Sequence, residues 1–276
     1  MMSEAVIAVE NLKKSYGKHT VLEDITLNVN KGDIYGLIGK NGAGKTTLFK
    51  ALLGLSRYDS GKLSILGAKN ARENNHNRRR IGFFVGANFY GYLNAKQNLQ
   101  YFMKLKGIKD KNEADRVLEI VGLNTDAAKA PAERFSLGMK QRLGIANALL
   151  GNPDILIFDE PINGLDPQGI HDVRTLIERV NKEEGKTIIV SSHILSELEH
   201  TATRFGIIHN GVVLKELTLD DFRTQENVTS INVADQDVER AKKVLADAGI
   251  AVKGTEQARS SLEDFYFNLI GGADNA

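Results

Sequence analysis

Cysteine is absent from the chain. Its absence excludes disulfides, thiolate metal sites and cysteine nucleophiles, and it is typical of a protein in a reducing cytosol. An excess of charge is also lacking, because 36 lysine and arginine residues stand against 35 aspartate and glutamate residues. No overall basic field attracts nucleic acid or an acidic membrane surface, so we expect no nucleic-acid partner and look for local interaction surfaces.

Long apolar runs are lacking as well. No stretch approaches the roughly 20 apolar residues of a membrane span. Residues 1–7 show no basic segment followed by a long apolar one, so we expect no secretory signal. If the protein acts at a membrane, another chain must cross it. The 276 residues, 42% of them hydrophobic, suffice for one large domain or for a domain with an appendage.

The most informative stretch is GKNGAGKT, residues 39–46, which lies between an apolar run and a helix-like run. It fits the phosphate-binding loop pattern. Glycines let backbone N–H groups converge on a polyanion, and the following helix N-terminus adds its positive dipole end. Lys45 would reach the β and γ phosphates, and the Thr46 hydroxyl would bind Mg²⁺, which prefers oxygen ligands. The alternative is a glycine-rich turn that only links a strand to a helix.

The hydrophobic pattern predicts an α/β chain with an antiparallel patch beside a parallel sheet. A helical insert interrupts it, and the basic segment 70–80 is predicted to be a solvated face, with a specific anionic partner as the alternative. The expected strands are 5–9, 21–29, 34–38, 62–67, 81–85, 155–158 and 187–190, with a polar link at 13–18 and a hairpin over 205–219. The expected helices are 46–53, three segments near 99–105, 114–121 and 143–150, and 167–181.

Acidic side chains follow the apolar run at 155–158. Ligands of open α/β sheets bind at the carboxyl ends of the strands, so Asp159 and Glu160 at that edge indicate chemistry rather than solvation. The apolar run at 187–190 also ends in polar residues, up to His193. A lone histidine in such a place is otherwise a cap or a packed polar residue.

The segment FSLGMKQRL, residues 135–143, resembles the signature motif of ATP-binding cassette (ABC) transporters. With the phosphate loop before it and the acidic strand end after it, the chain resembles the nucleotide-binding subunit of such a transporter over residues 5 to about 220. The resemblance implies a P-loop NTPase fold: a cassette at 1–221 with a parallel-sheet core, an antiparallel β subdomain and a helical insert at about 86–150. A small α/β extension at 222–276 would follow, with a strand at 229–233 and helices at 238–248 and 262–270.

The resemblance also implies residue roles. Asp159 would hold Mg²⁺ through water, Glu160 would be the general base that polarises the attacking water, and His193 would contact the γ phosphate. Tyr16 would stack on adenine, or be an ordinary packed surface tyrosine. The expected phosphate cradle is Gly39, Asn41, Gly42, Gly44, Lys45, Thr46 and Thr47.

Other implied roles need two subunits. Ser136 and Gly138 would bind the γ phosphate of ATP held by the opposite subunit, and the loop ending at Asp166 would cross the dimer interface. Taken alone, Ser136 is an ordinary helix N-cap. Two ATP molecules would thus join a homodimer or heterodimer, and hydrolysis would release it.

The chain departs from the family pattern at Gly86, where most members have glutamine and a large subgroup has glutamate. Glycine can neither ligate a metal nor hold a water molecule, which puts in doubt how the insert senses ATP. Leu137 and Met139 also replace the common glycine and glutamine of the signature. The string SLGMKQRL at 136–143, with NFYG at 88–91 and LEDF at 262–265, resembles the subgroup that exports lantibiotics and bacitracin or protects against them. The aromatic residues Phe89 and Tyr90, with Tyr92, would either dock a permease or bury against the insert.

We therefore expect a cytoplasmic, membrane-peripheral ATPase subunit that dimerises on ATP and powers export of a peptide or drug through a separate transmembrane permease. One alternative is a soluble ATPase of the same fold that acts on nucleic acid or ribosomes without a permease. A second is an ATP-sensing module with little turnover. The role of 222–276 stays open between regulation, dimer stabilisation and permease contact.

Overall fold

The computed structural model describes residues 4–86, 89–123, 125–193, 198–219, 221 and 233–250. The chain forms two compact units, Met1–Leu219 and Asp220–Ala276. The boundary predicted after residue 221 lies next to this division, and the roles assigned to the two parts remain predictions.

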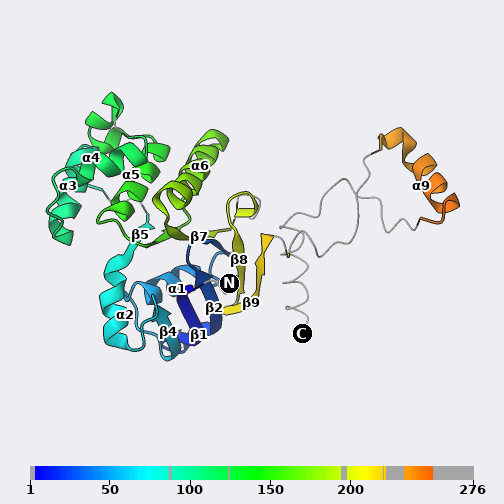
Figure 1. Cartoon of the computed structure of the whole chain (residues 1–276), viewed down its shortest axis with the longest axis horizontal. Coiled ribbons are helices and arrows are strands. Elements are labelled where there is room, and N and C mark those ends of the chain that lie inside the picture. Colours follow the sequence, from blue (N-terminus) through cyan, green and yellow to red (C-terminus); the bar gives the residue numbers. More distant parts are fainter. Residues whose placement is uncertain are drawn as a thin grey trace. The chain divides into compact units, whose positions relative to one another are not determined.

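The described part of the first unit is organised on one mixed sheet with the strand order β4-β1-β2-β9-β8-β3-β7-β6-β5 (Figure 1). Strands β4, β1 and β2 pair antiparallel, whereas β8, β3, β7, β6 and β5 pair parallel. The predicted antiparallel patch beside a parallel sheet is therefore confirmed. The strands are β1 (Ala5–Tyr16), β2 (His19–Asn30), β3 (Ile34–Ile38), β4 (Ser60–Ile65), β5 (Ile81–Val85), β6 (Ile155–Asp159), β7 (Thr187–Ser192), β8 (Arg204–His209) and β9 (Val212–Thr218).

The burial of each strand explains its sequence pattern. Every residue of β3 and of β7 is buried, as expected for parallel strands covered on both faces. In β2, by contrast, Ile25, Leu27 and Val29 are buried and alternate with exposed residues, because only one face of the strand meets the core. The central strands therefore carry the polar site residues only at their carboxyl ends.

The helical insert contains α3 (Ala95–Lys106), α4 (Glu113–Ile120) and α5 (Leu137–Leu149), which gather beside α6 (Pro167–Glu184) in Figure 1. Helix α5 begins well before the predicted start at residue 143, because Ser136 caps it. Helix α5 packs so closely on β5 that a Cβ added at Gly144 would overlap the Phe84 ring. The other described helices are α1 (Lys45–Leu52), α2 (Ala71–Asn77) and, in the second unit, α9 (Val238–Asp247).

Near the antiparallel edge, the polar link predicted at 13–18 is wrong, whereas the solvated face predicted for segment 70–80 is confirmed, because eight of its eleven residues are exposed. Segment 70–80 contains α2, whose buried Asn74 accepts a hydrogen bond from the Ile65 amide (2.9 Å) and donates one to the Leu63 carbonyl (2.6 Å). This one inward-facing side chain thus satisfies backbone groups of edge strand β4, while most of the segment remains exposed. The expected polar link at 13–18 is the end of β1 and a tight turn into β2, since Tyr16 still pairs with His19.

In the second unit, α9 confirms the helix predicted at 238–248. The strand predicted at 229–233 lies outside the described residues except for Val233, and the helix predicted at 262–270 lies outside them entirely. Among the helices that the structure describes, none combines the length and apolar character needed to cross a bilayer.

A charged clamp holds α4 against the end of α5. The Arg116 guanidinium donates two hydrogen bonds to the Glu113 carboxylate (2.8 and 2.9 Å), which also accepts one from the Gly151 amide (2.8 Å). Lys106 donates to the Asn147 carbonyl (2.9 Å) in the last turn of α5. Burial would raise the pKa of Glu113, but the hydrogen bonds from Arg116 and Gly151 outweigh it and hold that pKa below its ordinary value.

We predict that Glu113→Gln lowers the free energy of unfolding by about 2 kcal/mol at pH 7, because it removes a charge-assisted pair. A carboxylate with a depressed pKa stabilises the fold above its ordinary pKa of 4.5, and this contribution is lost as the pH falls through the lower value. The difference from the parent in urea unfolding should therefore shrink below about pH 4. Glu119→Gln, an exposed change on the same helix, is the control and should cost little at either pH; a Glu113 effect independent of pH would contradict the charge argument.

Candidate active site

Parallel strand pairing brings distant parts of the chain to one sheet edge. β7 lies between β3 and β6, so Ser191 is aligned with Leu37 on one side and with Asp159 on the other. The loop after β3, the acids after β6 and the polar end of β7 therefore meet at the carboxyl ends of the strands. This is the edge at which open α/β sheets bind ligands.

The loop after β3 wraps around a lysine. Gly44 is the N-cap of α1 with φ 111°, a left-handed conformation that favours glycine. Lys45 is buried, and its ammonium donates to the carbonyl oxygens of Gly39 (2.5 Å) and Lys40 (3.2 Å). Helix α1 has no side-chain cap and no acidic residue in its first turn, so no residue of the helix itself neutralises its positive end. Of the other cradle residues, Asn41 and Gly42 lie exposed in the loop, and Thr47 is half-buried in α1.

Five predicted residues from three segments come together here. The Thr46 hydroxyl donates to Asp159 Oδ2 (2.7 Å), and Lys45 Nζ lies 3.3 Å from Glu160 Oε1. His193 Nδ1 hydrogen-bonds the other Glu160 oxygen, Oε2. Both oxygens of the Glu160 carboxylate are thus held, one by a lysine and one by the histidine predicted to contact phosphate.

A buried serine, which the sequence analysis did not single out, joins the two acids. Ser191 Oγ donates to Asp159 Oδ1 (2.6 Å) and accepts a hydrogen bond from the Glu160 amide (3.0 Å). The sequence signal was only the polar end of an otherwise apolar strand. Which acid such a hydroxyl meets depends on strand register, which that signal does not contain.

Tyr16 lies apart from this cluster, at the end of β1. The residue is 49% exposed, so its side chain is partly open to solvent, while its hydroxyl lies 3.3 Å from Ser56 Oγ. The Lys14 ammonium lies 5.0 Å from the ring centroid, a cation–π contact. The residue is therefore neither buried nor fully packed, and part of its aromatic side chain is accessible at this position.

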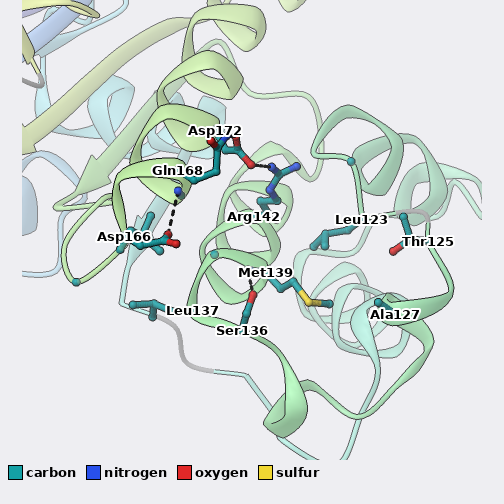
Figure 2. Close-up of a pocket in the computed structure, with 15 residues that line it drawn as sticks. Leu123, Thr125, Ala127, Ser136, Leu137, Met139, Arg142, Asp166, Gln168 and Asp172 are labelled. Carbon is teal, nitrogen blue, oxygen red and sulfur yellow. Dashed lines mark hydrogen bonds and ion pairs between the residues drawn. The ribbon is translucent and has the colours of Figure 1, made fainter.

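The remaining predicted residues, Ser136, Gly138 and Asp166, line a separate hollow of about 570 Å³ between the N-termini of α5 and α6 (Figure 2). Ser136 Oγ accepts a hydrogen bond from the Met139 amide (3.2 Å), and Asp166 Oδ1 accepts one from the Gly169 amide (3.0 Å). Both side chains are N-caps, which bears out the ordinary interpretation of Ser136. As caps they leave the remaining first-turn N–H groups of two helices directed at one hollow.

An ion pair spans this hollow, and sequence analysis missed it. Figure 2 shows the Arg142 guanidinium of α5 facing Asp172 of α6, with a nitrogen–oxygen distance of 2.8 Å. Gln168 donates to the same carboxylate (2.7 Å) from one helical turn away. The spacing of Gln168 and Asp172 on one helix face was the available signal, but their partner on α5 becomes evident only from the helix packing.

Gly86 follows β5 directly, beside the acids, because Val85 pairs with Asp159. Its φ is +68°, and a Cβ there would meet no atom within 4 Å. Space is therefore not the reason for glycine at this position. The left-handed backbone explains the glycine, because a residue with a side chain is strained in that conformation even where there is room for the side chain.

Comparison with known proteins identifies the family. The family model described as "ABC transporter" matches residues 22–163. The bacitracin transport ATP-binding protein BcrA of Bacillus licheniformis is 39% identical over 97% of this chain and 98% of its own length. The chain belongs to the ABC transporter family. A lantibiotic transport ATP-binding protein of Streptococcus pyogenes, SrtF, is 43% identical over 81% of this chain and 95% of its length.

Solved ABC structures agree with this assignment. The ATP-binding subunit of an ABC transporter superposes with a TM-score of 0.70 at 30% identity, covering 96% of this chain and 99% of that one. A dimeric ATP-binding cassette in a post-hydrolysis state, bound to ADP and Pi, gives 0.67 at 26% identity over 77% of this chain and 98% of that one. The chain is thus an ABC ATPase with the P-loop NTPase fold, as the sequence predicted.

We predict that Gly86→Ala destabilises this ABC ATPase by about 1 kcal/mol, because alanine must adopt a left-handed backbone there. Gly86→Asn should cost less, since asparagine tolerates that conformation. Urea unfolding of the two variants and the parent measures both effects. An alanine variant as stable as the parent would show that the left-handed backbone does not explain the glycine.

Proposed function

We propose that this chain is the ATP-hydrolysing subunit of an exporter that moves an antimicrobial peptide or drug of the bacitracin or lantibiotic type through a separate membrane permease. The observation that carries the proposal is the match to a bacitracin transport ATP-binding protein over nearly the whole of both chains. That match extends beyond residues 22–163, the part common to the wider family.

The phosphates of ATP would lie in the loop at the N-terminus of α1. The uncapped helix end attracts the polyanion, and Lys45 would exchange its carbonyl contacts at Gly39 and Lys40 for phosphate oxygens. Asn41, Gly42, Gly44 and Thr47 would complete the cradle with Gly39 and Lys45. Tyr16, with its side chain partly open to solvent, would stack on the adenine.

The donors beside the loop suit a magnesium ion. Thr46 and Asp159 offer a hydroxyl and a carboxylate whose oxygens lie 2.7 Å apart, and these are hard ligands. Among the described residues no cluster of three or more His, Cys or acidic side chains could hold a metal by itself. This fits an ion bound by one or two protein groups together with phosphates. Bound there, Mg²⁺ would supply charge neutralisation on the β and γ phosphate oxygens.

Glu160 would act as the general base. Lys45 and His193 hold its two oxygens, so the carboxylate is oriented before a water molecule reaches it. When phosphate takes up Lys45, the same carboxylate becomes free to accept a proton from that water. His193 would then turn to the γ phosphate.

The hollow between α5 and α6 supports a dimer. Ser136, Gly138 and the two helix N-termini would form an anion site separate from the chain's own loop after β3. We assign it to the γ phosphate of ATP held by a second ATP-binding subunit, identical or not. Asp166 would belong to the loop that follows Asp159 and Glu160 and crosses the dimer interface. The dimeric relative with bound ADP and Pi supports this arrangement.

A cluster of aromatic side chains offers a surface for the permease. Tyr90 contacts Tyr92 and Tyr101 edge to face, with centroid distances of 5.9 and 4.7 Å, and Phe89 contacts Phe102 at 6.3 Å. Phe89 and Tyr90 thus pack on α3, while Tyr92 stays 72% exposed. This aromatic cluster would place the subunit at the cytoplasmic face of the membrane.

We predict that Glu160→Gln reduces steady-state ATP hydrolysis at least about a hundredfold, because the base is lost. It should at the same time stabilise an ATP-bound dimer, because the amide leaves the phosphate contacts in place. Hydrolysis assays and light scattering with and without ATP measure the two effects. Glu119→Gln, on the exposed face of α4, is the control. A Glu160→Gln variant that hydrolyses ATP as fast as the parent would show that Glu160 is not the general base.

We predict that Tyr92→Ser, combined with Tyr101→Ser, lowers co-purification with the co-expressed permease by roughly tenfold or more, as expected for aromatic anchors of an interface. Leu55→Ser removes an equally exposed apolar side chain outside the cluster and should not change recovery. Recovery of the parent with nucleic acid and never with a membrane protein would refute the export function.

A further inference from the structure

The hydroxyl of Ser191 is fully buried, yet both its hydrogen-bonding directions serve the acidic end of β6. It donates to Asp159 Oδ1 at 2.6 Å and accepts from the Glu160 amide at 3.0 Å. It contacts the side chain of the first acid and the backbone of the second. One oxygen atom therefore fixes two neighbouring residues that have different tasks.

The first bond sets the direction of a carboxylate. Asp159 Oδ2 receives the Thr46 hydroxyl, so the two carboxylate oxygens are held from opposite sides by one hydroxyl each. Without Ser191, the carboxylate could rotate partway about its Cβ–Cγ bond and tilt away from the orientation in which one of its oxygens meets Thr46. Hydrogen bonds of this kind orient metal ligands, and losing one typically costs 10- to 100-fold in metal affinity or activity.

The second bond supports a strained backbone. Glu160 has φ +52°, which is costly for a residue with a side chain. Its amide must find an acceptor because the site is part-buried, and Ser191 Oγ provides it. Loss of that acceptor lets Glu160 relax and withdraws its carboxylate from the position held by Lys45 and His193.

The same strand carries a buried hydroxyl with a different use. Thr187, at the start of β7, accepts a hydrogen bond from the Gly32 amide (2.9 Å), far along the strand from the acids. Its hydroxyl only ties β7 to a neighbouring turn. Thr187 therefore separates the effect of losing a buried strand hydroxyl from the effect of losing this particular one.

We infer that Ser191 is a positioning residue for ATP hydrolysis. Its hydroxyl aims Asp159 at the metal and holds Glu160 in the strained backbone geometry that presents the base. The inference rests on the proposed roles of Asp159 and Glu160. It adds to them a residue that touches neither phosphate nor metal and acts through both acids.

The test measures metal binding without turnover. Mn²⁺ replaces Mg²⁺, and its affinity for the full chain with a non-hydrolysable ATP analogue is followed by electron paramagnetic resonance. In Ser191→Ala we expect Mn²⁺ affinity to fall roughly tenfold and kcat to fall by tenfold or more. The metal-free affinity for the analogue should change little, because the Ser191 hydroxyl bonds the two acids. The KM for the metal–ATP complex should rise by about the factor by which metal affinity falls. Ser191→Thr keeps the hydroxyl and should restore both losses.

Thr187→Val is the matched control and should keep the parent's Mn²⁺ affinity and kcat, with urea unfolding reporting the stability of every variant. The inference is wrong if Ser191→Ala binds Mn²⁺ as the parent does, or if Thr187→Val reproduces its losses. A parent chain that shows no analogue-dependent Mn²⁺ binding would overturn the proposed metal site and this inference together. A defect confined to Ser191→Ala supports both.

Discussion

The register of β7 between β3 and β6 is the constraint on which the site depends. It aligns Ser191 with Leu37 on one side and with Asp159 on the other. Leu37 and Ser191 lie more than a hundred positions apart along the chain. A shift of one residue would turn the Ser191 side chain to the other face of the sheet, since side chains alternate along a strand. The buried apolar surface of the central strands opposes such a shift, so the same packing that stabilises the core fixes the site.

Helices α5 and α6 position the proposed second half of the site by a different means. Their N-termini are fixed by side-chain caps, Ser136 and Asp166, and the Arg142–Asp172 pair joins them one or two turns further on. At the far end of α5, Lys106 donates to one of its last carbonyls. Positive charge thus meets the negative helix end, and the positive end is left facing the hollow. The direction of the two dipoles favours an anion in the hollow, which is the role proposed for it.

The sequence predicted those parts of the candidate site that consist of consecutive residues forming a motif. The loop 39–46, the signature segment 135–143 and the acids after β6 could be predicted, because each motif carries its own local geometry. Ser191, the Arg142–Asp172 pair and the Asn74 contact with β4 could not. Each is a contact between elements that are distant in sequence, and it depends on strand register or helix packing. A polar residue in a strand or helix gives no indication of which partner the fold will bring to it.

Two left-handed residues at neighbouring strand ends show how the chain distributes strain. Gly86 after β5 has φ +68° and Glu160 after β6 has φ +52°, and β5 and β6 pair side by side. At the first position the chain carries glycine, for which this conformation costs almost nothing. At the second it keeps a side chain and supports the cost with the hydrogen bond from its amide to Ser191. At these two neighbouring strand ends, strain is therefore retained where a carboxylate stands and avoided where the chain carries no side chain, and retained strain of this kind is typical of functional sites.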